Sequence, residues 1–132
     1  MSDHKVVEGL FYTKEHEWVK IEGENATVGI TDHAQDLLTD IVFVELPNTG
    51  KQVRQFDPAC VVESVKSVSD VYAPVGGTVS EINAELENSP EKVNADAYGE
   101  GWMFKLSGVN ADEAGSLMSA EQYNEFVANS SH

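Results

Sequence analysis

Cysteine is almost absent from this sequence of 132 residues: Cys60 is the single example, so no disulfide can form within the chain. The neighbours of Cys60 are apolar. This setting is typical of a cysteine that packs as a small hydrophobic residue, not of a nucleophile. The composition therefore gives no indication of an oxidising compartment.

Long apolar segments are also missing. No run approaches the roughly 20 residues that a transmembrane helix needs. Residues 1–8 show neither the apolar segment of a secretory signal peptide nor the arginine-rich pattern of a transit peptide. These absences predict a cytoplasmic protein, as in a bacterium. A protein of the mitochondrial matrix that had lost its import sequence would look the same.

Basic residues are few, with 8 Lys and Arg against 23 Asp and Glu and a formal net charge of −15. Phosphate backbones and anionic lipid surfaces would repel such a chain, so we expect neither nucleic acid nor membrane as a partner. The acidity has two interpretations. It keeps the protein in solution, or it serves recognition by partners with basic docking surfaces, where complementary charge mainly raises association rates.

Motifs for catalysis and metal binding are missing as well. The histidines show no close ligand spacing and no cysteine cluster accompanies them, so no metal site is expected at His4, His16, His33 or His132. The pair Gly76-Gly77 reads as a turn, not as a phosphate-binding loop. Nothing local suggests a nucleophile activated by a neighbouring base. We therefore expect a protein that is not an enzyme.

The sequence does contain a series of short strand patterns. Apolar and polar residues alternate on both sides of the turn signal at 22–25, which predicts a hairpin over residues 17–30. Further strands are predicted at 41–46, 59–65, 78–82 and 102–106. Many short strands separated by turns favour a small β-sandwich or barrel-like fold. The length suits one domain over 1–132, with a core at about 10–107.

Two helical regions complete the pattern. Thr31 is placed to N-cap a short internal helix over residues 32–39. The apolar residues expected to face inward from it are Ala34, Leu37 and Leu38.

The C-terminal helical segment is predicted at about 110–128. Its capping pairs are Asn110 with Glu113 and Ser119 with Gln122. The apolar residues that follow at helical spacing are Tyr123, Phe126 and Val127. This spacing predicts a helix that lays one apolar face on the sheets.

Lys66 is the most informative residue. It lies between two strand-like segments in Glu63-Ser64-Val65-Lys66-Ser67-Val68-Ser69-Asp70, so a hairpin would put it at or beside the tip. Lys66 is also the only Lys or Arg between Arg54 and Lys92. The charges around it in that window are all acidic: Asp57, Glu63, Asp70, Glu81, Glu85, Glu87 and Glu91.

Position and charge alone favour a solubilising lysine on a turn. A Schiff-base lysine needs a desolvated amine or a neighbouring cation, and the polar, acidic surroundings of Lys66 argue against that chemistry. A third interpretation is a lysine that carries a cofactor. The segment 63–70 alone does not establish it, and the other parts of the sequence have to support it.

The octapeptide resembles the lipoylation hairpin of the glycine cleavage system H-protein family. Other blocks are similar to the family in the same order, from about Leu10 to Phe126. They are His16-Glu17-Trp18-Val19, Gly29-Ile30-Thr31-Asp32-His33-Ala34-Gln35-Asp36, Val42-Phe43-Val44-Glu45-Leu46-Pro47, Ala73-Pro74 and Gly99-Glu100-Gly101-Trp102. A lone Val-Lys-Ser would be a weak signal, whereas this ordered set is specific.

The resemblance implies a mainly β fold, the lipoyl/biotinyl-type barrel-sandwich hybrid of two small antiparallel sheets with a C-terminal helix. It also implies that a lipoate ligase or lipoyltransferase joins lipoate to Lys66 through an amide. The lipoyl arm would accept an aminomethyl group from glycine decarboxylase and present it to an aminomethyltransferase. Dihydrolipoamide dehydrogenase would then reoxidise the arm. Family members are usually monomeric.

Two carboxylates match family positions that lie near the amine of the loaded arm, Glu17 and Asp70. A carboxylate facing an ammonium in a partly dry site makes a charge-assisted hydrogen bond. The alternative is that both are solvated surface acids among 23 acidic residues. Glu15 stands where some relatives have a small hydroxyl residue. The contact that this position makes near the amine is therefore in doubt.

Other carriers fit less well. Biotin carriers usually place Met on both sides of the lysine, whereas Val65 and Ser67 flank Lys66 here. Lipoyl domains of 2-oxo acid dehydrogenases usually have Asp before the lysine and are shorter. A non-catalytic binding module of the same fold would not need the intact modification motif. A lipoyl relay, in which Lys66 passes its lipoyl group to other proteins, stays compatible with the sequence.

Overall fold

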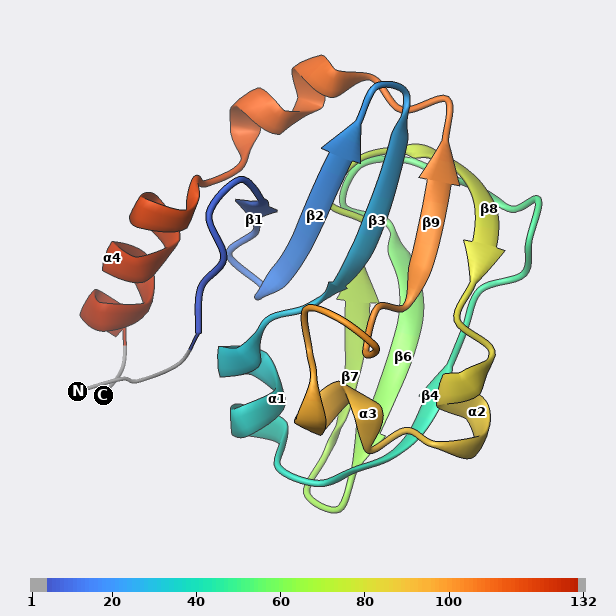
Figure 1. Cartoon of the computed structure of the whole chain (residues 1–132), viewed down its shortest axis with the longest axis vertical. Coiled ribbons are helices and arrows are strands. Elements are labelled where there is room, and N and C mark those ends of the chain that lie inside the picture. The colour runs from blue at the N-terminus through green and yellow to red at the C-terminus, as the bar shows by residue number, and fades with distance from the viewer. Residues whose placement is uncertain (1–4, 131–132) are drawn as a thin grey trace.

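Two antiparallel sheets form the body of the protein in the computed structural model, which describes residues 5–130. The larger sheet has the strand order β1 (Phe11–Tyr12), β2 (Glu17–Glu22), β3 (Asn25–Ile30), β9 (Phe104–Ser107), β8 (Gly77–Ile82), β5 (Gln52–Val53). The smaller has the order β4 (Ile41–Glu45), β6 (Pro58–Ser64), β7 (Val68–Tyr72). Figure 1 shows β2, β3 and β9 in front of β6 and β7. The predicted mainly β fold is confirmed.

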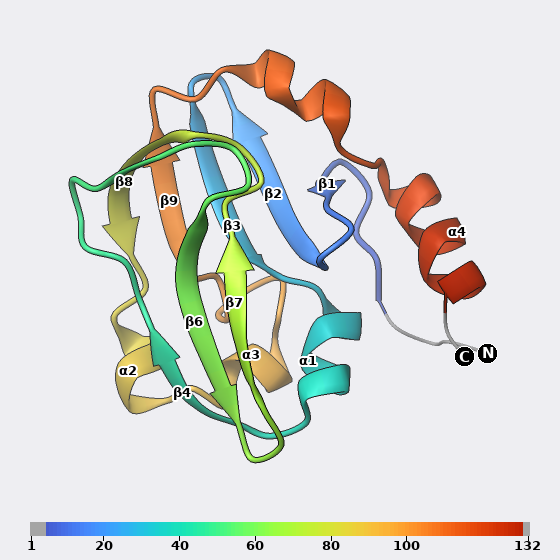
Figure 2. The ribbon, with the colours of Figure 1, turned by 180° about the vertical axis from the view of Figure 1, so that it is seen from behind.

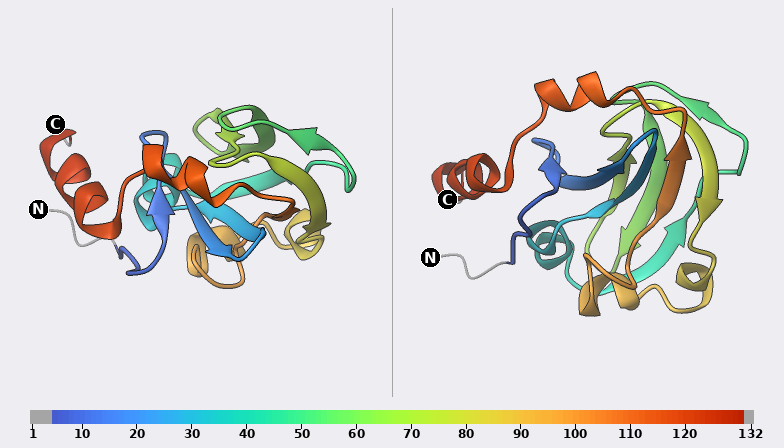
Figure 3. Two further views of the ribbon diagram at one scale, coloured as in Figure 1. Left: turned by 90° about the horizontal axis from the view of Figure 1, so that it is seen from above. Right: turned by 45° about the horizontal axis from the view of Figure 1, so that its top comes forward.

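The core lies between the two sheets, because alternate residues of each strand point to opposite faces. Val19 and Val28 reach it from the larger sheet and Val62 and Val71 from the smaller, each no more than 1% exposed. Each buried valine of this kind contributes roughly 1.5 to 3 kcal/mol relative to an exposed one. Figure 3 shows the sheets as separate layers.

The predicted hairpin over 17–30 is formed by β2 and β3, whose register runs from Glu17 opposite Ile30 to Glu22 opposite Asn25. Gly23 adopts a φ of 66° in the connecting turn, a left-handed conformation that suits glycine. The hairpin fixes where β2 begins, and therefore where Glu17 enters the interior.

The internal helix α1 (Asp32–Leu38) begins as predicted, since the Thr31 side chain accepts a hydrogen bond from the Ala34 N–H at 3.1 Å. Ala34 is buried and Leu38 is partly buried. The expectation that Leu37 faces inward is wrong, because its side chain is 52% exposed. Leu37 lies about 60° around the helix from Ala34. The carbonyl of Leu37 contacts the Lys66 side chain on the β6–β7 turn.

The C-terminal segment divides into a 3-10 helix, η1 (Ala111–Ser116), and the helix α4 (Ala120–Ser130). Ser119 and Gln122 cap each other reciprocally, as predicted, at 2.9 and 3.2 Å. The other expected pair is only half formed. Asn110 accepts from the Asp112 N–H, but the Glu113 carboxylate accepts from the Gly76 N–H at 2.7 Å and so ties η1 to the body.

The predicted apolar face of α4 packs beyond the larger sheet's edge strand β1. Tyr123 and Val127 are buried, and Phe126 is partly buried. The rings of Tyr123 and Tyr12 stack with centroids 4.7 Å apart. α4 therefore covers the edge of the sheet, as Figure 1 shows.

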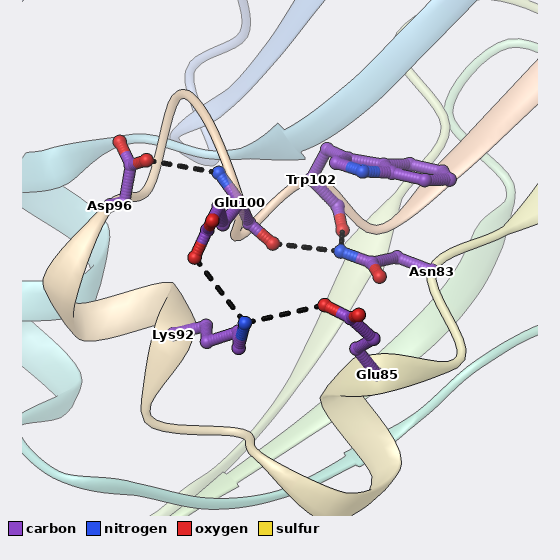
Figure 4. Close-up of polar contacts among 6 residues, drawn as sticks. All are labelled: Asn83, Glu85, Lys92, Asp96, Glu100 and Trp102. Atoms are coloured by element: carbon purple, nitrogen blue, oxygen red, sulfur yellow. Dashed lines mark hydrogen bonds and ion pairs between the residues drawn. The ribbon is translucent and has the colours of Figure 1, made fainter.

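Two four-residue helices, α2 (Glu85–Asn88) and α3 (Lys92–Ala95), lie between β8 and β9 and were not predicted. A polar network holds them. The Lys92 ammonium lies 3.3 Å from the carboxylates of both Glu85 and Glu100. The Asn83 amide donates to the carbonyls of Glu100 and Trp102 (Figure 4). Such contacts leave little periodic signal in a sequence, because they join short segments through side chains.

Candidate functional site

The turn between β6 and β7 is an ordered platform for Lys66. The strands pair up to Glu63 opposite Val68, and the Ser64 N–H donates to the Ser67 carbonyl at 2.8 Å. The Ser64 hydroxyl oxygen accepts from the backbone N–H groups of Lys66, at 3.1 Å, and Ser67, at 3.0 Å. The backbone under Lys66 is thus fixed by hydrogen bonds within four residues. Figure 2 shows this turn at the bottom of the molecule.

The Lys66 side chain is exposed and projects from this turn, as the sequence predicted. Its ammonium donates to the Leu37 carbonyl oxygen at 3.4 Å, a long contact at the C-terminal end of α1. A modifying enzyme could therefore reach this nitrogen without opening the core.

A second element supports the turn from the side. The Val65 N–H donates to the Asp40 carbonyl at 3.0 Å, so the bend between α1 and β4 is bonded to the turn. Asn94 on α3 holds that bend: its side chain accepts from the Ile41 N–H at 2.9 Å and donates to the Thr39 carbonyl at 2.8 Å. Sequence reasoning missed Asn94, because an asparagine in a four-residue helix carries no recognisable pattern.

Glu17 lies inside the body and is 1% exposed. One carboxylate oxygen accepts from the Thr13 hydroxyl, and the other accepts from the Tyr72 N–H at 3.0 Å. Burial raises the pKa of this carboxyl from 4.5 to about 7, against the opposing effect of the hydrogen bonds from Thr13 and Tyr72. Glu17 thus connects β2 to the free edge of β7, an arrangement that sequence reasoning did not foresee.

Asp70 lies on β7, opposite Val61 of β6, with an exposed side chain. It is two residues into the strand that follows the Lys66 turn. Asp70 and Tyr72, whose N–H donates to Glu17, therefore lie on the strand that leads away from Lys66.

A groove of about 560 Å³ opens where β7 ends. Its lining residues are Tyr12, Thr13, Lys14, Glu15, Phe56, Tyr72, Ser116, Leu117 and Met118. Glu15 thus lines a partly apolar groove together with Thr13 and Tyr72, the hydrogen-bond partners of Glu17. Sequence reasoning missed this groove, because its walls come from four separate segments.

The structure gives little support for a cysteine nucleophile or a metal site in the described residues. Cys60 is buried, and burial raises the pKa of its thiol to about 12, which makes it a poor nucleophile. Within residues 5–130 no three His, Cys, Asp or Glu side chains gather in a way that could hold a metal ion. His4 and His132 lie outside the described residues. Within the same range, no helix has the length and apolarity needed to cross a bilayer.

Comparisons with known proteins show which family the chain belongs to. The sequence model of the family described as "Glycine cleavage H-protein" matches residues 10–130. The glycine cleavage system H protein of Rubrobacter xylanophilus is 54% identical over 119 residues, which cover 90% of this chain and 92% of that protein. The probable H protein of Pyrococcus abyssi is 53% identical over 129 residues, 96% of each chain.

A solved structure agrees as well. The crystal structure of the glycine cleavage system H protein from Mycobacterium marinum superimposes with a TM-score of 0.80 at 32% identity, covering 94% of this chain and 98% of that one. The chain therefore belongs to the glycine cleavage system H-protein family, the non-catalytic lipoyl carriers of glycine catabolism.

Proposed function

We propose that Lys66 is the residue to which the lipoyl group is attached, through an amide to its side-chain nitrogen. The observation that carries this proposal is the exposed Lys66 ammonium on a turn whose backbone is fixed by Ser64. The residues present fit the group, because nothing in the described chain covers this nitrogen except the long contact to the Leu37 carbonyl. The paired strands β6 and β7 hold the attachment point in place, and the exposed turn leaves the attached group free to move.

The attachment reaction needs an activated lipoyl donor, which a lipoate ligase or lipoyltransferase supplies. The deprotonated Lys66 nitrogen attacks the acyl carbon, the new C–N bond forms, and the donor's leaving group departs. The proton lost by the amine goes to solvent, so the positive charge of Lys66 disappears. When bound, lipoate supplies reversible dithiol chemistry, which no amino-acid side chain offers on a long tether.

The remaining partners follow from the family. We propose that Lys66 presents its group in turn to glycine decarboxylase, an aminomethyltransferase and dihydrolipoamide dehydrogenase, in the cytoplasm. A single exposed tip suits this role, because it can enter several active sites without any change in the two sheets. The carrier's own residues contribute placement, and its partners contribute the catalysis.

We propose further that Asp70 and Glu17 form the acidic side of a resting site for the loaded arm. Asp70 supports this role by its exposure on the strand that leads from Lys66. Glu17 supports it through its position behind Tyr72, beside the groove that Glu15 lines. Carboxylates at a partly dry site stabilise an ammonium through charge-assisted hydrogen bonds.

The attachment site is tested by intact mass. The chain is co-expressed with a lipoate ligase, with and without lipoate, and we expect a mass increase of one lipoyl amide that disappears in Lys66→Arg. The matched control is Lys51→Arg, because Lys51 is also an exposed lysine. Retention of the added mass in Lys66→Arg, or a biotinyl mass instead, would refute the assignment.

A further inference from the structure

Phe56 combines an unfavourable backbone conformation with an exposed ring. Its φ is 70°, in the left-handed region that glycine adopts freely and that is strained for a bulky side chain. The side chain is 50% exposed, so burial of the ring offsets only part of that strain. The stability of the fold therefore does not explain a phenylalanine at this position, and strained residues of this kind cluster at functional sites.

Hydrogen bonds hold residues 54–57 in this conformation without any help from the ring. The Asp57 N–H donates to the Arg54 carbonyl at 3.0 Å, and the Asp57 carboxylate accepts from the Arg54 N–H at 2.9 Å. The Phe56 N–H donates to the Ala73 carbonyl at 2.6 Å, and the Ala73 N–H donates to the Asp57 carbonyl at 2.8 Å. All these bonds involve the backbone of the turn, so they form whatever side chain residue 56 has.

The neighbouring Gln55 fixes the turn against η1. Its side-chain amide donates to the Glu113 carbonyl at 3.0 Å and to the Ser116 hydroxyl at 2.9 Å. Residues 116–118 form one wall of the groove that opens where β7 ends. Phe56 therefore keeps a fixed position relative to that wall.

The Phe56 side chain also lines this groove, whose volume is about 560 Å³. The other side chains of apolar or aromatic character around the groove are Tyr12, Tyr72, Leu117 and Met118. An acid, Glu15, lines it too, and the buried Glu17 accepts from the Tyr72 N–H at 3.0 Å. The groove thus joins an apolar lining to nearby carboxylates.

We propose that Phe56 is a positioning residue for the lipoyl arm, whose hydrocarbon and sulfur end rests against the Phe56 ring in this groove. The proposal rests on the proposed attachment at Lys66 and on the proposed resting site. An aromatic ring suits the arm, because contacts between sulfur and an aromatic ring are favourable and because methylene groups gain from burial.

The ring would also limit the access of water to the loaded arm. Water converts the aminomethyl thioether into the free thiol, formaldehyde and ammonium: the bond between carbon and sulfur breaks, the sulfur gains a proton, and the water oxygen stays with the carbon. A side chain that covers the sulfur end slows this loss. The strain at Phe56 would then serve the protection of the arm.

Thermal unfolding of the unmodified chain separates a role in the fold from a role in the groove. Phe56→Gly relieves the strained φ, and we expect the Tm to rise by roughly 3 °C, even though glycine gives the unfolded chain more freedom. Phe56→Tyr keeps both the ring and the strain and should leave the Tm unchanged. A fall of the Tm in Phe56→Gly would show that the ring serves the fold and would overturn the proposal.

Methyl resonances of ¹³C-labelled methionine report whether the arm lies in the groove. Met118 lines the groove, whereas Met103 is buried in the core. The lipoylated chain is reduced and loaded with formaldehyde and ammonium, the reverse of the hydrolysis. We expect loading to shift the Met118 resonance in the unaltered chain and in Phe56→Tyr, and to shift it by less than half as much in Phe56→Gly. The Met103 resonance should not move in any of them.

The half-life of the aminomethyl group, followed by mass spectrometry, should be about fivefold shorter in Phe56→Gly and unchanged in Phe56→Tyr. The matched control is Thr39→Gly, which also replaces a residue of positive φ, here 65°, but lies outside the groove. It should raise the Tm as Phe56→Gly does and leave the half-life unchanged. An equally short half-life in Thr39→Gly would overturn the role of Phe56.

The outcomes distinguish this proposal from those on which it rests. If the unaltered chain gains no lipoyl mass at Lys66, the attachment site and everything built on it fall. Lipoylation without a Met118 shift on loading removes the resting site and the role of Phe56 together. A Met118 shift and a half-life in Phe56→Gly that equal those of the unaltered chain overturn the role of Phe56 alone.

Discussion

The Asn94 side chain donates to the Thr39 carbonyl at 2.8 Å and accepts from the Ile41 N–H at 2.9 Å, so a single amide spans the bend between α1 and β4. Thr39 has a φ of 65° and a ψ of −148°, a region populated almost entirely by glycine. The same bend bonds the Lys66 turn through the Asp40 carbonyl. Asn94 therefore stabilises a strained bend that supports the site.

Removal of this amide should loosen the turn. We expect Asn94→Ala to lower the free energy of unfolding by about 2 kcal/mol, because it leaves polar backbone groups of the bend without partners. Hydrogen exchange should become faster at the Val65 N–H. Asn124→Ala, at an exposed position on α4, should do neither. Unchanged exchange at Val65 would show that the bend stands without Asn94.

Relief of the backbone strain at Thr39 should raise the free energy of unfolding, which is the opposite of the effect expected for Asn94→Ala. Thr39→Gly removes the β-branched side chain from a conformation that costs about 1 to 3 kcal/mol. Part of the gain is offset by the greater freedom of glycine in the unfolded chain. We expect a net rise of about 1 kcal/mol in unfolding free energy, measured by denaturant titration. A fall in stability would contradict the presence of strain at Thr39.

The buried Glu17 and the partly buried His16 should make stability depend on pH in opposite directions. Burial raises the pKa of Glu17 from 4.5 to about 7, so the native state holds a proton that the unfolded chain has released between those values. Glu17 therefore lowers stability as the pH rises through that window, by up to about 3 kcal/mol. Burial, aided by His33, lowers the pKa of His16 from 6.5 to about 4, so His16 lowers stability as the pH falls through its window.

In the unaltered protein the Glu17 and His16 contributions to the pH dependence of stability oppose each other. Variants that remove one group at a time should reveal each contribution separately. In Glu17→Gln, stability relative to the unaltered chain should increase from pH 4.5 to 7. In His16→Asn, which tolerates the φ of 73° at this position, the relative stability should increase as the pH falls from 6.5 to 4. Urea titrations at several pH values measure both. Parallel curves for all three proteins would show that neither group titrates in these windows.

Gly29 allows Trp18 to lie across the β2–β3 pair. A Cβ atom at Gly29 would lie 2.7 Å from the Trp18 ring, whose indole N–H donates to the Ala97 carbonyl at 3.0 Å. We expect Gly29→Ala to lower the unfolding free energy by about 2 kcal/mol, since overpacking displaces the ring. Gly115→Ala meets no atom within 4 Å and is the control. Equal stability of the two variants would contradict the close packing.

The resting site for the loaded arm has its own test. Asp70→Asn and, at a pH above 7, Glu17→Gln should leave lipoylation intact and shorten the half-life of the aminomethyl group on the loaded carrier, because each then removes a negative charge near the ammonium. The matched control is Glu125→Gln on α4. The half-life is followed by mass spectrometry of the loaded protein. An unchanged half-life in both variants would remove these acids from the resting site.

The sequence by itself determined the local elements and the family. Alternation around 22–25 specified the β2–β3 hairpin, Thr31 specified the start of α1, and Ser119 with Gln122 specified the start of α4. Each of these signals depends on residues only a few positions apart, so the chain carries them before it folds. The placement of Lys66 on a turn between two strands is of the same kind.

Only the tertiary structure decided which polar side chains enter the interior. Glu17 bonds to the β7 edge 55 positions away, and Asn94 reaches a bend 53 positions away. The exposure of Leu37 and the outward row of Phe43, Glu63 and Val68 likewise depend on which strands pair and where they end. No local pattern encodes such contacts, because they exist only once the two sheets have packed together.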